Sequence, residues 1–339
     1  MEINRVFFYF FIVPFFGFAQ TFSGTVIDKA TQQPIETASV YFDNTTIGTT
    51  TNEKGEFSIT YSDAVQSTLV ISYLGYQKVF INDYRIKNNV IIALVEAANT
   101  LDAVYLDYDD GLTRKQKLKL FRKEFLGSSR FAKSCKILNE EDLILRYNRQ
   151  NKALYASALK PIIVENNALQ YEVAFEILEY EASYYQANPE TNVFNIKALT
   201  YFGTSFFKDT NIEHKKRFFK NREKAYKGSV QHFMRSLFYQ NLKAEGYHVF
   251  SGKFRVNEWD YFKVIETENR DSKIVTLKKE VSILFNKKMQ SKIELKIPEF
   301  YVDIYGNYSP ILGVYFSGDL GMQRVGDMLP SNYGLDIEQ

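Results

Sequence analysis

Residues 21–95 consist of short segments with an apolar residue at every second position, separated by turn residues. In "ETASVYFDN" and "EFSITY" this alternation predicts strands that bury one face. The residues expected on the buried faces are Ala38, Val40, Phe42, Phe57, Ile59 and Tyr61. Between them "NEKG" predicts a turn that Asn52 caps and in which Gly55 takes a positive φ. About seven short strands, roughly ten residues apart, predict a two-sheet β-sandwich over residues 20–96.

The same region is similar to a known family. "GTVIDKATQQPIETASVYFDNTTIGTTTNEKGEFSI", followed by "LVISYLGYQK", resembles the carboxypeptidase-regulatory-like domain, a transthyretin-like β-sandwich. The resemblance implies an accessory module without catalytic residues, of a kind found in Gram-negative envelope proteins, often ahead of a TonB-dependent transporter barrel. The roughly 230 residues that follow Asp107 are too few for such a barrel, which needs about 22 strands. The resemblance therefore implies a spacer or interaction module rather than a protease.

Residues 1–19 have the pattern of a secretory signal peptide. The apolar run from Val6 to Phe18 is too short to span a bilayer comfortably. Gly17 and Ala19 are the small residues expected before a cleavage between Ala19 and Gln20. The alternative is an uncleaved membrane anchor. We expect an exported protein, periplasmic or peripherally attached to the outer membrane, with no transmembrane span in the mature chain.

Charge and cysteine content narrow the possible partners and cofactors. A net charge of +2 gives no global field that would attract nucleic acid. Cys135 is the one cysteine in the sequence, so neither an intramolecular disulfide nor a multi-cysteine metal site can form. Free cysteine is among the most buried residue types, and we expect a buried structural thiol.

Residues 97–127 are expected to form a linker strand and a basic helix. "NTLDAVYLD", Asn99 to Asp107, resembles the segment that often follows this sandwich in transporters. It predicts an edge strand or linker, or else a strand that pairs with a partner's sheet edge. "TRKQKLKLFRKEFLG" predicts a helix that begins near Thr113 and ends at Gly127. Its apolar stripe is Leu118, Phe121 and Phe125. Its basic residues are either a solvated face or a contact for anionic lipid or polysaccharide.

Residues 128–339 are expected to form an α+β domain of unknown function, with β-hairpins on either side of one long amphipathic helix over 213–244. The expected core stripe of this helix is Phe219, Tyr226, Val230, Phe233 and Leu237. Its first half is strongly basic, but export argues against nucleic acid as the partner. "FLGSSRFAKSCKILN", "KNREKAYKGSVQHFMRSLF" and "YGNYSPILGVYFSGDLGMQRVGDMLPSNYG" resemble a group of exported envelope proteins with the same N-terminal sandwich. That resemblance implies a shared C-terminal fold and carries over no catalytic residue.

The common catalytic motifs are missing from the sequence. The three histidines, His214, His232 and His248, occur in neither an HxxE nor an HExxH motif, so we expect no zinc site and no metallocarboxypeptidase activity. The sequence also lacks a G-x-S-x-G elbow, a phosphate-binding loop and a dinucleotide fingerprint. We expect no cofactor. Paired carboxylates remain open, since spacing in the sequence does not report spacing in the fold.

Two segments supply the candidate binding residues, which are Arg222, Tyr226, Ser229, His232, Asp319, Arg324 and Asp327. The first lies in "KNREKAYKGSVQHFMRSL" and the second in the glycine-rich "SGDLGMQRVGDMLP". The structural alternative is that Ser229 packs or caps, and that an Arg–Asp ion pair fixes the glycine-rich turns. We favour a non-enzymatic binding or scaffolding protein whose partner is a glycan or another envelope protein. The alternative is a hydrolase whose first candidate residues, Asp319, Arg324, Asp327 and His232, meet in one cleft.

Overall fold

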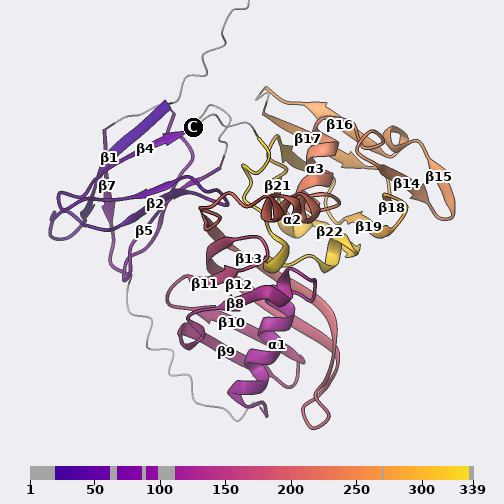
Figure 1. Ribbon diagram of the computed structural model, residues 1–339, viewed down its shortest axis with the longest axis horizontal. Coiled ribbons are helices and arrows are strands. Elements are labelled where there is room, and N and C mark those ends of the chain that lie inside the picture. The colour runs from indigo at the N-terminus through magenta and orange to yellow at the C-terminus, as the bar shows by residue number, and fades with distance from the viewer. Residues whose placement is uncertain (1–19, 62–66, 86–88, 98–110, 269–270, 336–339) are drawn as a thin grey trace, which may run out of the picture.

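The computed structural model describes residues 20–61, 67–85, 89–97, 111–268 and 271–335 (Figure 1). The expected signal peptide, including Ala19, and the segment Asn99–Asp107 lie outside these residues, while Gln20 begins the first strand. The described chain is mainly β, as predicted, and its buried apolar side chains form three clusters. Within it, no helix is long and apolar enough to cross a membrane.

The first unit is the expected seven-stranded sandwich. One sheet has the order β4-β1-β7 and the other β3-β2-β5-β6. The strands are β1 (Gln20–Asp28), β2 (Ser39–Phe42), β3 (Gly48–Thr50), β4 (Glu56–Tyr61), β5 (Leu69–Ser72), β6 (Val79–Ile81) and β7 (Val90–Leu94). All six side chains expected on the inner faces are buried. The alternating pattern therefore identified the core of this domain correctly.

The turn between β3 and β4 forms as predicted. The Asn52 Oδ1 accepts the backbone N–H groups of Lys54 and Glu56, at 2.9 Å each. Gly55 has φ +71°, where a side chain would be strained. The turn sets the direction of β4, so that Phe57 and Ile59 face the core.

The second unit is a six-stranded sheet covered by α1 (Arg114–Leu126). The sheet has the order β8-β11-β12-β10-β9, and β13 pairs with β12 along nearly its whole length. The strands are β8 (Cys135–Ile137), β9 (Leu143–Asn148), β10 (Ala153–Ala158), β11 (Ile162–Asn166), β12 (Tyr171–Asn188) and β13 (Val193–Asp209). As predicted, Thr113 caps the start of α1 and Gly127 its end. Phe121 and Phe125 of α1 are fully buried against the sheet.

The third unit has two sheets, of order β15-β14-β18-β19-β22 and β16-β17-β20-β21, and its core includes α3 (Val230–Phe238). The strands are β14 (Tyr247–Ser251), β15 (Phe254–Val256), β16 (Phe262–Glu266), β17 (Ser272–Leu277), β18 (Val281–Phe285), β19 (Met289–Leu295), β20 (Glu299–Asp303), β21 (Tyr308–Ser309) and β22 (Val314–Gly318). The short 3₁₀ helices of the chain are η2 (Ala132–Ser134), η3 (Glu140–Asp142), η4 (Glu258–Asp260), η5 (Ile311–Gly313), η6 (Leu320–Met322) and η7 (Val325–Asp327). Residues 128–339 thus contribute to two hydrophobic clusters, one of which also includes α1.

The prediction of one long helix over 213–244 is wrong. The chain forms α2 (Lys216–Tyr226) and then α3, with a turn between them. Gly228 in this turn has φ +82°, and the Ser229 side chain accepts the N–H of His232 to start the new helix. The left-handed backbone conformation of Gly228 ends α2, and the N-cap Ser229 begins α3. The two helices therefore do not share one helical periodicity.

The five-residue stripe predicted for that helix fails for the same reason. It assumes a single helical phase from Phe219 to Leu237, which the turn interrupts. Phe219 is 42% exposed, and its neighbour Phe218 is buried in its place. On α3, where the phase starts again, Phe233 and Leu237 are fully buried as expected.

Candidate functional site

The sandwich is joined to the six-stranded sheet by the loop after β2, residues 43–46. The Asn44 N–H donates to the Ser205 carbonyl at 2.6 Å, and the Phe207 N–H donates to the Thr45 carbonyl at 2.9 Å. The Asp43 carboxylate accepts the Ser205 N–H at 2.8 Å. The loop therefore pairs with the end of β13 as a short extra strand would.

Side chains extend this contact on both sides. Tyr41, on the outer face of β2, packs its ring on Phe206 with ring centroids 5.5 Å apart, and its hydroxyl lies 3.1 Å from the Thr204 hydroxyl. Lys78 of the sandwich forms an ion pair with Glu176 of β12. The sandwich is thus fixed to the sheet by backbone pairing, ring packing and charge together.

Asp43 makes this junction sensitive to pH. Burial raises the pKa of Asp43 to about 6 from its ordinary value of 3.8, so the folded state favours the protonated form. The contribution of the Asp43 carboxyl to the free energy of unfolding is fully present below pH 3.8 and is lost as the pH rises through 6. The variant Asp43→Asn keeps an acceptor for the Ser205 N–H without the charge. We therefore expect the free energy of unfolding of Asp43→Asn, relative to that of wild type, to be about 2–3 kcal/mol greater at pH 8 than at pH 4.

Urea denaturation of both proteins at the two pH values measures this difference. Asp260→Asn, at an exposed position of η4, controls for the removal of one negative charge. A variant minus wild-type difference that stays constant with pH would show that Asp43 is ionised in the folded protein throughout.

The C-terminal residues 330–333 form the third side of the junction. The Ser331 N–H donates to the Asn44 carbonyl at 2.6 Å, and the Asn332 amide donates to the Thr46 hydroxyl at 3.0 Å. From α3, the buried Arg235 donates to the carbonyl oxygens of Ser331 at 2.6 Å and Tyr333 at 2.8 Å. It also donates to the Tyr305 carbonyl at 3.0 Å. One guanidinium therefore ties the C-terminal residues to the core of the third unit.

A cavity of about 390 Å³ lies where these parts meet. It is lined by residues of the sandwich, of the six-stranded sheet and of the C-terminal segment. These residues are Thr46, Tyr171, Phe206, Phe207, Lys208, Asp209, Pro330, Asn332 and Tyr333. We call it the junction cavity. Its lining combines aromatic rings with an ammonium, a carboxylate and an amide.

Arg222 of α2 supports one wall of the junction cavity. It is 2% exposed, and its guanidinium carbon lies 3.8 Å from the centroid of the Tyr171 ring. The guanidinium bonds both carboxylate oxygens of Asp209, at 2.7 and 2.8 Å, and the carbonyl oxygens of Leu169 and Gln170, at 2.8 Å each. Burial raises the pKa of Asp209, but the hydrogen bonds from Arg222 and from the Asn211 N–H, together with the positive charge of Arg222, outweigh burial and lower that pKa. Two lining residues are thereby held in place.

The candidates from the first segment divide between two positions. Arg222 contacts the lining residues Tyr171 and Asp209, and Tyr226 packs on Tyr333 with ring centroids 5.6 Å apart. Ser229 and His232 lie at the turn between α2 and α3, where Ser229 acts as the N-cap. The sequence therefore located two residues beside the junction cavity and two that shape a helix start.

His232 is bound on both ring nitrogens within the fold. Its Nδ1 accepts the Gly228 N–H at 3.1 Å and lies 3.0 Å from the Tyr247 hydroxyl. Its Nε2 lies 3.1 Å from a Glu245 carboxylate oxygen. Because Nδ1 accepts a backbone N–H, we assign the ring proton to Nε2, where it donates to Glu245. Burial lowers the pKa of His232 despite the nearby carboxylate.

The candidates of the glycine-rich segment are held locally. An Asp319 carboxylate oxygen accepts the Gln290 N–H at 2.6 Å and closes the end of the β19–β22 pair. The Arg324 guanidinium donates to the carbonyl oxygens of Gly321 and Gln323, at 2.6 Å each. Asp327 accepts the Arg324 backbone N–H at 3.5 Å, and burial raises its pKa. The turn is thus fixed through backbone groups.

The two candidate segments do meet, through a residue that sequence reasoning missed. The Gln323 side chain accepts the Val230 N–H at 3.0 Å and donates to the Gly228 carbonyl at 3.1 Å. It serves as a cap for the α2–α3 turn. The junction cavity is lined neither by His232 nor by the candidates of the second segment.

Arg235 is the other important residue that the sequence did not single out. A signal was present, since Arg235 stands alone as a charge among Phe233, Met234 and Leu237. A charged residue in an apolar helix is buried only when it is paired or fully hydrogen-bonded. Its partners, however, are carbonyl groups some 70 to 98 residues away, and no local pattern reports them.

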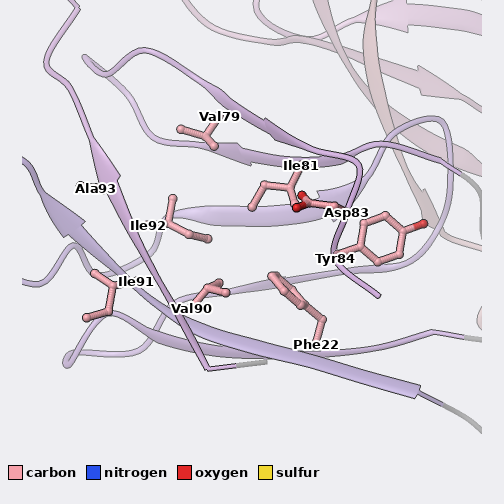
Figure 2. A pocket seen from close by; sticks show the side chains of 9 residues that line it. All are labelled: Phe22, Val79, Ile81, Asp83, Tyr84, Val90, Ile91, Ile92 and Ala93. Atoms are coloured by element: carbon pink, nitrogen blue, oxygen red, sulfur yellow. The ribbon is translucent and has the colours of Figure 1, made fainter. Parts of the chain in front are cut away.

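A second cavity, of about 350 Å³, opens within the sandwich between the edge strands β6 and β7. Figure 2 shows side chains of β6 facing those of β7, with the Phe22 and Tyr84 rings at one end. The lining residues are Phe22, Val79, Ile81, Asp83, Tyr84, Val90, Ile91, Ile92 and Ala93. We call it the sandwich cleft. All but Asp83 are apolar or aromatic.

Neither a cluster of metal ligands nor a reactive thiol is found in the described structure. Over the described ranges, no three His, Cys, Asp or Glu side chains come together in a way that could hold a metal ion. The Cys135 Sγ lies 3.5 Å from the Phe131 carbonyl, and burial, with Asp327 nearby, raises the pKa of this thiol to about 12. A thiol in such a position is a weak nucleophile at neutral pH.

Comparison with known proteins identifies the first unit. Residues 22–106 match the family of the CarboxypepD_reg-like domain, so the sandwich is a domain of this kind, as its sequence predicted. No curated protein matches the chain. One similar solved structure is a 9R-lipoxygenase from Cyanothece PCC8801, with 10% identity over 65% of this chain and a TM-score of 0.18. The match covers 48% of the lipoxygenase chain, and at this TM-score it carries no argument.

Proposed function

We propose that this protein is a non-enzymatic, exported cell-envelope protein that binds a glycan in the junction cavity. The observation that carries the proposal is the origin of the cavity walls. Thr46 comes from the sandwich, Tyr171 from the six-stranded sheet and Tyr333 from the C-terminal segment. The site is therefore a product of the docking of the sandwich, which gives the CarboxypepD_reg-like domain a scaffolding role.

The chemistry of the lining supports a sugar ligand. The partly exposed rings of Phe206 and Tyr333 offer faces on which the C–H groups of a pyranose can pack. Lys208, Asp209 and Asn332 offer donors and acceptors for hydroxyl groups. A volume of about 390 Å³ falls at the small end of ligand pockets, which span roughly 300–1,000 Å³. We infer a short oligosaccharide rather than a polymer segment of many units.

Export and envelope location form part of the proposal. They are supported by the signal-peptide pattern of residues 1–19 and by the resemblance to envelope proteins that carry this sandwich. We place the mature chain in the periplasm or at the periphery of the outer membrane. In this setting the glycans within reach are those of the envelope itself.

Tyr333→Ala tests the glycan site. This substitution removes one ring from the cavity wall and keeps the backbone carbonyl that Arg235 binds. We expect at least about a fivefold loss of affinity for whichever of a panel of peptidoglycan and lipopolysaccharide-core oligosaccharides the wild type binds, because a ring stacked on a ligand contributes about 1–3 kcal/mol. Isothermal titration calorimetry measures the affinity.

Tyr315→Ala is the matched control, since Tyr315 is a tyrosine on β22 that is 52% exposed and is not among the residues that line the cavity. This control variant should bind like wild type. Equal affinities for wild type and Tyr333→Ala, or no binding of any oligosaccharide in the panel, would refute the glycan site.

An envelope-protein partner is the second candidate, and the sandwich cleft favours it. Within the described residues, each of the edge strands β6 and β7 pairs with one neighbouring strand, and the lining between them is apolar or aromatic except for Asp83. An extended segment of another protein that carries apolar side chains would fit such a cleft by β-augmentation.

The hydrolase alternative has less support. It requires Asp319, Arg324, Asp327 and His232 to face one opening, whereas hydrogen bonds within the fold hold each of them. A general acid or base needs a free path to the substrate proton. We therefore retain binding as the proposed activity.

A further inference from the structure

The outer face of α2 is a row of lysines. Lys216, Lys220, Lys224 and Lys227 follow one another at steps of four, four and three residues, so they span only about 80° of arc. All four are exposed. The inner face of the helix is buried through Phe218, Arg222 and Ala225. The lysine row therefore points away from the body of the protein.

Among the residues that the structure describes, three of these lysines have no carboxylate partner. The two acidic residues of the region, Glu213 and Glu223, form ion pairs with Lys215 and Lys227. In the described part of the chain, no side-chain hydrogen bond or ion pair engages Lys216, Lys220 or Lys224. Their positive charge is thus open to an external partner.

Exposed apolar side chains lie beside the row. Ile212, in the loop before α2, is 84% exposed, and Phe219 on the helix is 42% exposed. The ring of His214, in the same loop, lies parallel to that of Phe219, with centroids 6.4 Å apart and an interplanar angle of 3°. Exposure of two large apolar side chains next to three unpaired cations is the amphipathic combination found on membrane-surface helices.

We propose that the segment Ile212–Lys227 docks on the surface of an anionic lipid bilayer. The lysine ammonium groups contact lipid phosphates, while Ile212 and Phe219 enter the region between the headgroups. Charge complementarity selects an anionic partner, and the apolar side chains select a bilayer over a soluble polyanion. A second copy of the chain would oppose like charges at this face.

The fold presents this surface already formed. Arg222 anchors the inner side of α2 through four hydrogen bonds to Asp209, Leu169 and Gln170. No folding of the helix has to accompany binding, unlike the case of an isolated peptide. The docking surface is also separate from the junction cavity, whose lining includes no residue of α2. Attachment to a membrane and glycan binding can therefore be tested independently.

The experiment uses the mature chain and sedimentation with vesicles of phosphatidylcholine alone or with about one third phosphatidylglycerol. We expect binding to the anionic vesicles, weakened by salt, and little binding to neutral ones. Each lysine near an anionic surface contributes roughly fivefold to partitioning. Lys216→Gln/Lys220→Gln/Lys224→Gln should therefore bind about a hundredfold more weakly, and Ile212→Ser/Phe219→Ser several-fold more weakly.

Lys253→Gln/Lys263→Gln/Lys278→Gln is the control, because it removes the same charge from exposed lysines of the third unit. It should bind like wild type. The proposal is overturned if the two triple variants bind equally, or if the wild type ignores anionic vesicles. It is also overturned if Ile212→Ser/Phe219→Ser binds vesicles like wild type, since the surface would then be a site for soluble polyanions. Unchanged circular dichroism of each variant confirms that it is folded.

Discussion

Arg222→Met is expected to lower the free energy of unfolding by about 2–4 kcal/mol. The substitution leaves an unbranched apolar side chain in place of the aliphatic part of arginine but removes every donor. The Leu169 carbonyl loses its hydrogen-bond donor. The Gln170 carbonyl keeps the Thr210 N–H and the Asp209 carboxylate keeps the Asn211 N–H, but both lose the guanidinium. Asp209 is 47% exposed and recovers part of its solvation, which places the effect below that of a fully buried pair. Urea denaturation near neutral pH measures the loss.

Two further variants locate the cause of this effect. Arg217→Met, an exposed neighbour on α2, should change stability by less than about 0.5 kcal/mol. Adding Asp209→Asn to Arg222→Met should restore about 1 kcal/mol, because the unpaired charge is gone. Equal stability of Arg222→Met and wild type would mean that α2 is held by its apolar contacts alone. In that case the guanidinium would be free for a role at the junction cavity.

The sandwich could be predicted because its information is local. Strands β1 and β4 alternate over nine and six residues, and the turn before β4 carries its own asparagine and glycine, Asn52 and Gly55. Tyr41 marks the limit of this reasoning. Alternation placed it on the solvent face, yet it is 8% exposed because it packs on Phe206. The alternation of apolar residues within one unit cannot show which of its outward-facing residues another unit will cover.

The candidate site shows the same division between local and distant information. Histidine, arginine and aspartate in two glycine-containing segments drew attention to Arg222, His232 and Asp327. In the fold each of them makes hydrogen bonds that serve a structural role. The His232 ring, for example, contacts a backbone N–H and Glu245. The junction cavity itself joins residues from Thr46 to Tyr333. It could be found only when the docking of three units was known.

The helix break is a case in which a strong periodic signal was misleading. Apolar residues recur at helical spacing on both sides of Gly228, and a single glycine within such a pattern is often tolerated. Here Ser229 follows directly and can cap a new helix. A glycine followed by a capping residue is a stop and start signal, and it outweighs the periodicity that spans it.

Gly228→Ala is expected to destabilise the protein by about 2–4 kcal/mol, in contrast to the gain that alanine brings inside a continuous helix. At φ +82° a side chain costs about 1 kcal/mol or more. A Cβ at this position would also lie 2.7 Å from a Phe285 ring carbon and 3.0 Å from the Met289 sulfur. Phe285 is 6% exposed in the core of the third unit, so the ring has little room to move. Urea denaturation monitored by circular dichroism measures both stability and helix content.

Gly252→Ala separates the two contributions to this cost. Gly252, in the turn between β14 and β15, has φ +61°, and a Cβ at this position would have no neighbouring atom within 4 Å in the described structure. Gly252→Ala should therefore lose only the free energy that the backbone conformation costs, about 1 kcal/mol. The difference in stability between the two variants is then the cost of crowding Phe285 and Met289. A Gly228→Ala protein that is more stable than wild type, with a stronger helical signal, would show that α2 and α3 can merge. The uninterrupted helix predicted over 213–244 would then be an accessible state, with Ser229 and Gln323 released from their capping contacts.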